Sequence, residues 1–157
     1  MSRTQRQPPL PGLLGEVREA VGVEIQGCLG GQGFSDLRPG HGCVFSYIDE
    51  EGTRLTDLAE RSGLTKQSVG EAVADLERHG YVERVPDPQD GRAKIIRLTP
   101  HGADAIAAAN RGFAEIEARY AAALGEQRYA EFRATLEELY ELTRSAEAAD
   151  VRQRDAA

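Results

Sequence analysis

Two short amphipathic helices, each ended by a glycine and followed at once by a hairpin pattern, constrain this chain more than any other feature. The segments "LTDLAERSG" (55–63) and "LTKQSVGEAVADLERHG" (64–80) carry apolar residues at helical spacing. Glycine favours the position after a helix because it adopts the left-handed backbone without a steric penalty. Thr56 and Thr65 stand near the two helix starts and are the expected N-caps. Two helices joined by such a short connection predict a helix-turn-helix.

A hairpin is expected after the second helix. The runs "YVERVPD" (81–87) and "KIIRLT" (94–99) are rich in β-branched residues, which strands favour. The stretch "DPQDGRA" (87–93) lies between them, and its Pro, Asp and Gly residues predict a long hairpin loop. Together with a short strand at Thr53–Arg54, these elements predict a winged helix-turn-helix whose wing is the hairpin. The expected fold class is mainly α with a small β component.

Helical patterns flank the predicted wing on both sides. Apolar residues recur at spacings of three and four over residues 13–28, and a short helix is expected near residue 44. A long helix from Pro100 and a second helix after Gly125 carry a heptad-type seam, which packs either within the chain or against a second copy. The seam consists of Ile106, Ala109, Phe113, Ile116, Tyr120, Ala123, Tyr129, Phe132, Leu136, Leu139 and Thr143.

These patterns divide the chain into five segments. The expected segments are a flexible arm (1–12), N-terminal helices (13–52), the winged helix-turn-helix (53–100), two C-terminal helices (101–146) and a frayed tail (147–157).

The totals of the chain set limits on its function. It has 157 residues and a formal net charge of −7, which suits one domain with extensions and argues against a general polyanion binder. No apolar run is long enough to predict a membrane span, and no apolar signal segment follows the N-terminus, so the expected location is the cytoplasm. The sequence carries no enzyme motif, so we predict neither a catalytic activity nor a cofactor.

The second helix of a helix-turn-helix places its N-terminal residues in the major groove of DNA. Here Lys66 suits phosphate or guanine, Gln67 suits adenine, and Glu71 can accept from cytosine. Hydroxyl groups near a helix start suit phosphate, and a glycine permits close approach of the backbone. The candidate DNA-binding residues of this helix are Thr65, Lys66, Gln67, Ser68, Gly70 and Glu71.

The wing adds a basic tip to this surface. Arg92 is a candidate for the minor groove, because narrow A·T-rich geometry attracts guanidinium groups. Lys94 is a candidate phosphate contact. Asp87 and Asp90 are expected to hold Arg84 or Arg92 in place by bidentate pairing, so these acidic residues support the wing.

The charge balance leaves a second interpretation open. Residues 64–98 carry six Lys or Arg against six Asp or Glu, which gives no net basic field. Winged helices also serve as protein–protein modules. A winged-helix interaction module is therefore the alternative to DNA binding.

The stretch "LTDLAERSGLTKQSVGEAVADLERHGYVERVPDPQDGRAKIIRLTPHG" (55–102) resembles the DNA-binding core of the MarR family of bacterial transcription regulators. It is similar to that family in its helix-turn-helix, its "GYVER" strand, its wing of the form DPxDxR and its closing "LTxxG" pattern. The chain departs from the family at Gly91, where an arginine is common, and this removes one candidate contact to the DNA backbone.

The resemblance implies a homodimer built from the first helix and the last two helices. It also implies a palindromic operator in double-stranded DNA, and release by a small-molecule effector or by cysteine oxidation. The expected function is a ligand-responsive repressor. A cavity is expected where the N-terminal helices meet the winged domain, because apolar pockets form in clefts between domains. His41, Phe45 and Ile48 are the candidate lining residues.

Cys28 and Cys43 are the candidates for redox sensing. A reactive cysteine needs partial exposure and an electropositive neighbourhood. Cys28 falls on the apolar stripe of the first helix and Cys43 beside His41, so buried, inert thiols are the favoured interpretation. A thiol-based regulator of the same fold is the alternative. A zinc site made by these three residues is disfavoured, because their spacing matches no standard ligand pattern.

Overall fold

The computed structural model of the protein describes the backbone of residues 8–155 and the side chains of residues 8–145. The chain divides into two compact units, one ending at Phe113 and the other beginning at Ala114, and each is described by itself. Helix α5 (Pro100–Leu124) passes from the first unit into the second.

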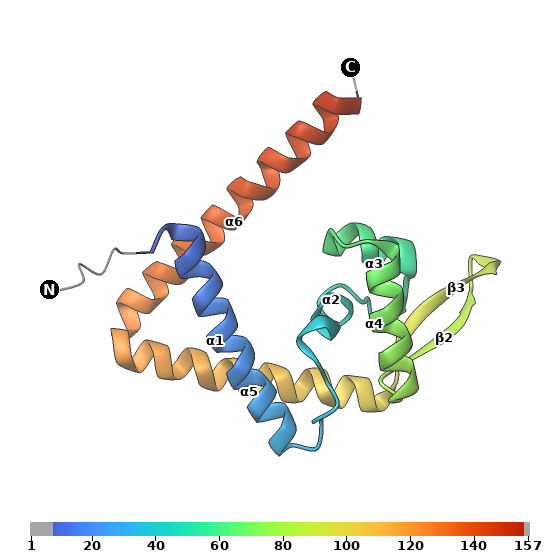
Figure 1. Ribbon diagram of the computed structural model, residues 1–157, viewed down its shortest axis with the longest axis horizontal. Helices are drawn as coiled ribbons and strands as arrows, with labels where there is room; N and C mark the ends of the chain where they lie inside the picture. Colours follow the sequence, from blue (N-terminus) through green and yellow to red (C-terminus); the bar gives the residue numbers. More distant parts are fainter. Residues whose placement is uncertain (1–7, 156–157) are drawn as a thin grey trace, which may run out of the picture. The chain divides into compact units, whose positions relative to one another are not determined.

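The first unit contains the winged helix-turn-helix that the sequence predicts (Figure 1). Helices α3 (Leu55–Ser62) and α4 (Lys66–Arg78) are joined by a short turn. Strands β2 (Val82–Asp87) and β3 (Asp90–Leu98) form the antiparallel hairpin, and β1 (Thr53–Arg54) pairs with the other edge of β3. The sheet order is therefore β1-β3-β2. The fold is mainly α with a small antiparallel sheet, as expected.

The ends of α3 and α4 confirm two of the predicted capping residues and contradict a third. Thr65 caps α4, and its hydroxyl accepts from the backbone N–H of Ser68. Gly63 ends α3 with a φ of 68°, a conformation that glycine adopts freely. The prediction of an N-cap at Thr56 was wrong. Strand β1 leads directly into α3, so Arg54 takes the N-cap position and Thr56 lies inside the first turn.

The hairpin connection is much shorter than the predicted loop over residues 87–93. Strand β3 begins at Asp90, which is opposite Asp87, so only Pro88 and Gln89 make the turn. The carboxylate of Asp87 accepts from the backbone N–H of Gln89 at 2.8 Å. This local bond replaces a backbone turn and lets the strand pairing continue almost to the tip.

Three elements precede the helix-turn-helix. They are α1 (Leu10–Gly31), the 3₁₀ turn η1 (Pro39–His41) and the short helix α2 (Gly42–Phe45). Helix α1 begins inside the arm expected over residues 1–12, because a proline such as Pro11 fits the first turn of a helix. The first seven residues of that arm lie outside the described residues.

The second unit holds the end of α5 and helix α6 (Glu126–Asp155), separated at Gly125, whose φ is 93°. Arg133 on α6 pairs with Glu117 on α5 and with Glu137 one turn along its own helix at 3.0 Å. The segment from residue 147, which was expected to fray, is helical through Asp155. Residues 147–155 include two alanines, two arginines, one glutamate and one glutamine, which favour helix without an apolar pattern.

The core of the first unit joins the helix-turn-helix to the sheet. Helix α4 supplies apolar side chains at spacings of three and four, and the hairpin supplies one face of its strands. The largest fully buried side chains of this core are Tyr81, Leu58, Leu76, Ile96, Val44, Val69, Val73 and Val82.

Helix α5 starts in tight contact with the hairpin. Gly102 is buried, and a Cβ atom at that position would lie 2.1 Å from the backbone oxygen of Tyr81. Thr99 donates to the same oxygen from its backbone N–H at 3.0 Å, and the N–H of Gly102 donates to the Thr99 hydroxyl at 3.1 Å. Only glycine fits here without moving the backbone.

Gly102→Ala should therefore lower the free energy of unfolding by about 1–3 kcal/mol, the usual cost of overpacking a closed site. Gly27→Ala is the matched control, because Gly27 is exposed within α1 and nothing lies within 4 Å of its added methyl. That control should gain roughly 0.5–1 kcal/mol from helix propensity. Urea unfolding at one fixed protein concentration measures both. Equal effects of the two changes would contradict the close packing.

Candidate nucleic-acid interface and adjoining cavity

The start of helix α4 presents polar side chains to solvent. The Thr65 and Ser68 hydroxyls lie 2.9 Å apart, and Lys66 and Gln67 stand between them in the chain. All four side chains are exposed. Because the first N–H groups of a helix have no carbonyl partner within it, this surface combines hydroxyls, an ammonium group and backbone donors. Such a set suits the oxygens of a phosphate.

A side-chain hydrogen bond orders the next turn of this surface. The amide of Gln67 donates to the carboxylate of Glu71, with 3.1 Å between Nε2 and Oε1. Both residues are exposed, so the bond fixes the direction of the amide without removing it from solvent. Gly70 lies between them, and the nearest atom to an added methyl is a Leu55 carbon at 3.9 Å. Packing within the unit therefore does not require this glycine.

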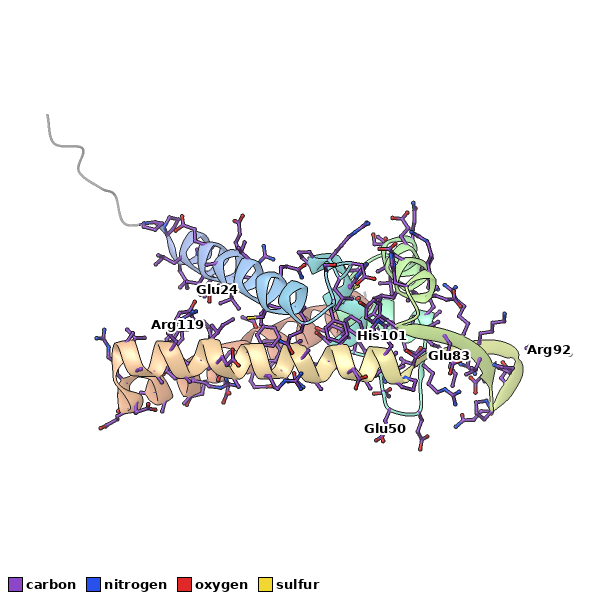
Figure 2. All side chains as sticks on the ribbon, turned by 90° about the horizontal axis from the view of Figure 1, so that it is seen from below. Glu24, Glu50, Glu83, Arg92, His101 and Arg119 are labelled. Atoms are coloured by element: carbon purple, nitrogen blue, oxygen red, sulfur yellow. The ribbon has the colours of Figure 1, made fainter. Side chains whose placement is uncertain are left out.

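The tip of the hairpin is basic. Figure 2 shows Arg92 at the free end of the β2–β3 ribbon. Arg92 and Lys94 are both exposed. Within residues 8–145, the ion pairs include neither of these two side chains nor Lys66. All three cations are thus available to an external anion.

Most of the acidic side chains between positions 64 and 98 form ion pairs with basic side chains. Glu77 pairs with Arg84, and Glu83 pairs with Arg97 at 2.7 Å. Asp87 instead pairs with Arg54, which lies outside this stretch. The equal count of acidic and basic residues therefore does not describe the surface: within residues 8–145, five of the six acids have a cationic partner, whereas Lys66, Arg92 and Lys94 have no acidic one. Glu71 is the exception, and it accepts from the amide of Gln67.

The support of the wing differs from the prediction. Asp87 holds neither Arg84 nor Arg92. Its Oδ2 accepts from Nε of Arg54 at 2.7 Å and from Nη2 at 2.5 Å. Asp90 lies 3.9 Å from the same guanidinium and accepts from the backbone N–H of Arg92 at 3.1 Å. The wing is therefore braced from β1, which pairs with β3 on the edge opposite to β2.

Because Asp87 is buried, its charged carboxylate needs the Arg54 partner. Asp87 is only 8% exposed, whereas Arg54 is half-buried. The backbone N–H of Gln89 and the guanidinium of Arg54 hold the pKa of Asp87 below its usual value, so the carboxylate stays charged at neutral pH. The sequence did not point to Arg54 as a support of the wing, because it lies more than thirty positions from Asp87 along the chain.

A cavity of about 440 Å³ lies within the first unit, between α1, η1, the start of α2 and the first half of α5. Of the three candidate lining residues, His41 and Phe45 line this cavity and Ile48 does not. The apolar wall includes Ile25, Leu29, Leu37, Ile106 and Phe113. The polar side chains of the lining are Arg18, Gln26, Arg38, His41, Ser46 and Asn110.

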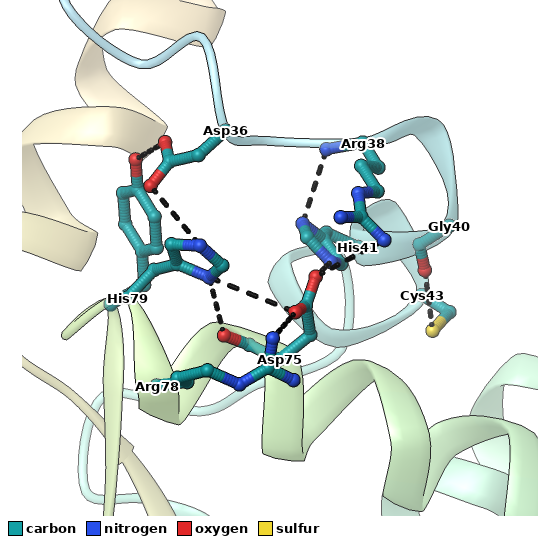
Figure 3. A network of polar contacts seen from close by, with 9 residues as sticks. Asp36, Arg38, Gly40, His41, Cys43, Asp75, Arg78 and His79 are labelled. Atoms are coloured by element: carbon teal, nitrogen blue, oxygen red, sulfur yellow. Dashed lines mark hydrogen bonds and ion pairs between the residues drawn. The ribbon is translucent and has the colours of Figure 1, made fainter.

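His41 connects this cavity to helix α4 (Figure 3). It is 4% exposed, and its Nε2 lies 3.0 Å from Oδ2 of Asp75 on α4. Its Nδ1 accepts from the backbone N–H of Arg38 at 3.1 Å. The sequence did not single out Asp75, because a lone aspartate in an amphipathic helix is normally solvent-facing.

Several basic side chains surround the buried carboxylate of Asp75. Arg78 lies 2.9 Å from Oδ1 and Arg38 lies 3.7 Å from Oδ2. Burial disfavours its charge, but Arg38, Arg78 and His41 outweigh burial and lower the pKa of Asp75. His79 caps the end of α4 and lies 3.8 Å from the same carboxylate. The carboxylate therefore stays ionised at neutral pH.

The two cysteines are separate and differ in surroundings. Cys43 is half-buried, its thiol donates to the carbonyl of Gly40 at 3.1 Å, and burial raises its pKa. A raised pKa leaves little thiolate and disfavours reactivity. Cys28 is half-buried on α1, with its sulfur 3.7 Å from where a Cβ at Gly112 would lie. Across residues 8–145, no cluster of His, Cys, Asp or Glu is arranged to hold a metal ion.

None of the helices among the described residues is both long and apolar enough to cross a membrane.

Comparison with known proteins finds a matching family model and similar folds. Residues 35–93 match the model of the MarR family. The transcriptional regulator HosA of Escherichia coli O111:H- is 32% identical over 72 residues, which are 46% of this chain. The chain spans about half the length of that curated relative, because the matched part is 53% of it.

Solved structures extend the likeness beyond the matched segment. The crystal structure of MarR has a TM-score of 0.73 and 25% identity, over 87% of this chain and 98% of that one. A mutant of S. aureus MepR bound to an oligodeoxyribonucleotide has a TM-score of 0.58 and 22% identity, over 87% of this chain and 99% of that one. The second likeness concerns the fold alone.

Replacing Arg54 should loosen the wing. In Arg54→Met the buried carboxylate of Asp87 is left without its charged partner, so the amide protons of the hairpin should exchange with solvent roughly threefold to tenfold faster. Hydrogen-exchange mass spectrometry of the β2–β3 peptides measures this change.

Arg97→Met is the control on the same hairpin. Arg97 pairs across the strands with Glu83, but both side chains are about half exposed, and such pairs contribute little. The control should leave hairpin exchange nearly unchanged. If both variants exchange alike, Arg54 does not brace the wing.

Proposed function

We propose that this chain, whose residues 35–93 belong to the MarR family, is a DNA-binding transcription regulator. The observation that carries the proposal is the pairing of the acidic side chains around α4 and the wing, which leaves Lys66, Arg92 and Lys94 without an ion pair among residues 8–145. A helix-turn-helix with a basic hairpin matches the two grooves and the phosphates between them. The oligodeoxyribonucleotide bound to the MepR mutant supports the same use of this fold.

Each element has a proposed role on the duplex. Helix α4 enters the major groove, where Gln67 and Glu71 reach base edges and their mutual hydrogen bond presets the direction of the amide. Thr65, Lys66 and Ser68 meet phosphates at the helix start. Gly70 allows the helix to approach closely. At the wing, Arg92 enters the minor groove and Lys94 meets the backbone.

A homodimer is the proposed functional form. Large apolar side chains remain exposed at helical spacing on both α1 and α6 in the single chain, and contiguous exposed apolar surface is typical of interaction sites. The seam expected on α6 includes Phe132 at 51% and Leu136 at 40% exposed. A second copy covering these helices would bury them. Two copies related by a two-fold axis would present two α4 helices to a palindromic operator.

The regulator is proposed to be a ligand-responsive repressor that acts in the cytoplasm and has no catalytic activity. The cavity beside α1 and α5 has a volume suited to a small molecule, and its wall is largely apolar with a few polar groups. A ligand there would act by favouring a state of the protein that fits the operator less well. The redox alternative is less favoured, because burial raises the pKa of the Cys43 thiol.

Operator binding tests the proposal directly. An inverted repeat in the DNA that flanks the coding region of this protein is the first probe, with a scrambled sequence of equal length as its control. We expect Arg92→Ala to weaken binding by about 1–3 kcal/mol for each base contact that it removes. Lys66→Ala should weaken all sequences alike and lower the slope of log affinity against log salt by about one for each phosphate that the protein no longer neutralises.

Arg128→Ala is the control for these variants, because Arg128 is an exposed arginine on α6, away from the wing in the chain. It should leave affinity and salt slope nearly unchanged. Fluorescence anisotropy across a salt series gives both quantities. Failure to bind any flanking DNA at low salt would favour the protein-interaction alternative.

A charge introduced into the α6 seam should break the dimer. Leu136→Glu would place a carboxylate in an apolar interface, where an unpaired charge is costly, so the chain should become monomeric at micromolar concentration. Ala134→Glu adds the same charge about half a turn away, on the opposite face of α6, and should remain dimeric. Analytical ultracentrifugation distinguishes the two states. A dimeric Leu136→Glu variant would remove α6 from the interface.

A further inference from the structure

His41 makes two hydrogen bonds that require its ring nitrogens to play opposite roles. The backbone N–H of Arg38 can only donate, so Nδ1 must accept and carries no proton. The carboxylate of Asp75 can only accept, so Nε2 must carry the proton and donate. The neutral imidazole with its proton on Nε2 satisfies both bonds. No other protonation state of histidine does.

We infer that neutral His41 is a positioning residue that bridges the Arg38 backbone in the cavity wall to Asp75 on the DNA-binding helix α4, and that protonation of His41 breaks this bridge at Arg38 and weakens DNA binding. A proton added to Nδ1 would point at the N–H of Arg38, and the two donors repel. The bond from the Arg38 N–H to the ring is then broken, so His41 stays bonded to Asp75 on α4 but no longer to the backbone at the start of η1. The inference rests on the proposed function and adds its regulation.

The bridge connects the cavity to helix α4, the two regions that regulation by a ligand must couple. Arg38 and His41 line the cavity, and Asp75 lies on the same helix as the candidate DNA-binding residues. Ten positions separate Asp75 from Thr65, which is about 15 Å along a helix. A rigid helix tilted at Asp75 would therefore displace its groove-facing start.

The surrounding charges favour the neutral ring. Burial lowers the pKa of His41, and although Asp75 opposes this, Arg38 and His79 add to it. The pKa of Asp75 is also lowered, so its carboxylate remains an acceptor throughout the range in which His41 titrates. Arg78 occupies the other oxygen of Asp75, Cys43 follows on α2, and Arg18 is the titratable group that α1 adds to the cavity lining. From α5, the cavity lining carries no titratable side chain.

The sign of the pH effect separates this inference from general electrostatics. Because the pKa of His41 is lowered in the folded protein, the bridged state is fully present above the ordinary pKa of histidine and disappears as pH falls through the lowered value. Acid should thus weaken operator binding. Simple charge attraction makes the opposite prediction, since protonated histidines add positive charge to the protein.

The test compares operator affinity of the full chain at about pH 7.5 and about pH 5.5, which span the ordinary pKa of histidine. We expect the affinity of the wild type to fall roughly tenfold at the lower pH, the factor that follows from breaking one hydrogen bond. His41→Gln should abolish this fall, because the amide can donate to Asp75 and accept from Arg38 but does not titrate. Unchanged or tighter binding by the wild type in acid would overturn the inference.

Two further histidine variants serve as controls. His101→Gln alters a ring that stacks on Tyr81, with 4.4 Å between centroids, and should retain the weaker binding in acid. His79→Gln should retain it as well, although His79 also faces Asp75. If His79→Gln abolishes the acid effect and His41→Gln does not, the bridge is assigned to the wrong residue and the inference fails.

A readout without DNA keeps the test independent of the proposed function. Nitrogen NMR of the wild-type His41 ring should show Nε2 protonated and Nδ1 unprotonated at neutral pH. The protection of the amides at Arg38 and along α4, measured relative to their intrinsic exchange rate at each pH, should fall in acid in the wild type and not in His41→Gln. If no flanking DNA binds at any pH, the proposed function fails, and this exchange comparison still decides the bridge. A ring protonated on Nδ1 at neutral pH would overturn it.

Discussion

The pairing of β1 with the middle of β3 is the interaction on which the rest of the winged domain depends. Only two residues form β1, yet Thr53 lies opposite Ile96 and Arg54 opposite Ile95. This pairing leads the chain directly into α3, so the helix-turn-helix is anchored to the hairpin at its first residue. It also carries the guanidinium of Arg54 to the buried carboxylate of Asp87, the last residue of β2 before the turn. Without that strand, helices and wing would be joined only through α4 and the core.

The surface that results explains how an acidic protein can present a basic face. The net charge of −7 describes the whole chain, whereas the field at a surface depends on which charges are paired. Around the winged domain, arginines are used to neutralise nearby carboxylates. The lysine at the start of α4 and the two cations of the wing remain. Charge counting along the sequence could not separate these populations, because the partners are set by the fold.

Much of the fold was predictable because its signals are local. Glycine after each short helix, the threonine cap of α4 and the turn residues of the hairpin act within a few positions of themselves. The candidate surface residues followed from the same local pattern. The errors came from non-local pairing: β1 displaced the expected cap from Thr56, and continued pairing of β2 with β3 shortened the loop. Arg54 and Asp75 went unnoticed for the same reason, since their partners are distant in the sequence.

Residues at the ends of three elements contact the backbone carbonyl oxygen of Tyr81. It accepts from the backbone and the hydroxyl of Thr99, and Gly102 packs against it without a side chain. The entry to β2, the exit from β3 and the first turn of α5 are thereby tied to one atom. The hairpin and the first turn of α5 are therefore held to each other at Tyr81, so a change in the direction of α5 relative to the helix-turn-helix would also change the direction of the wing.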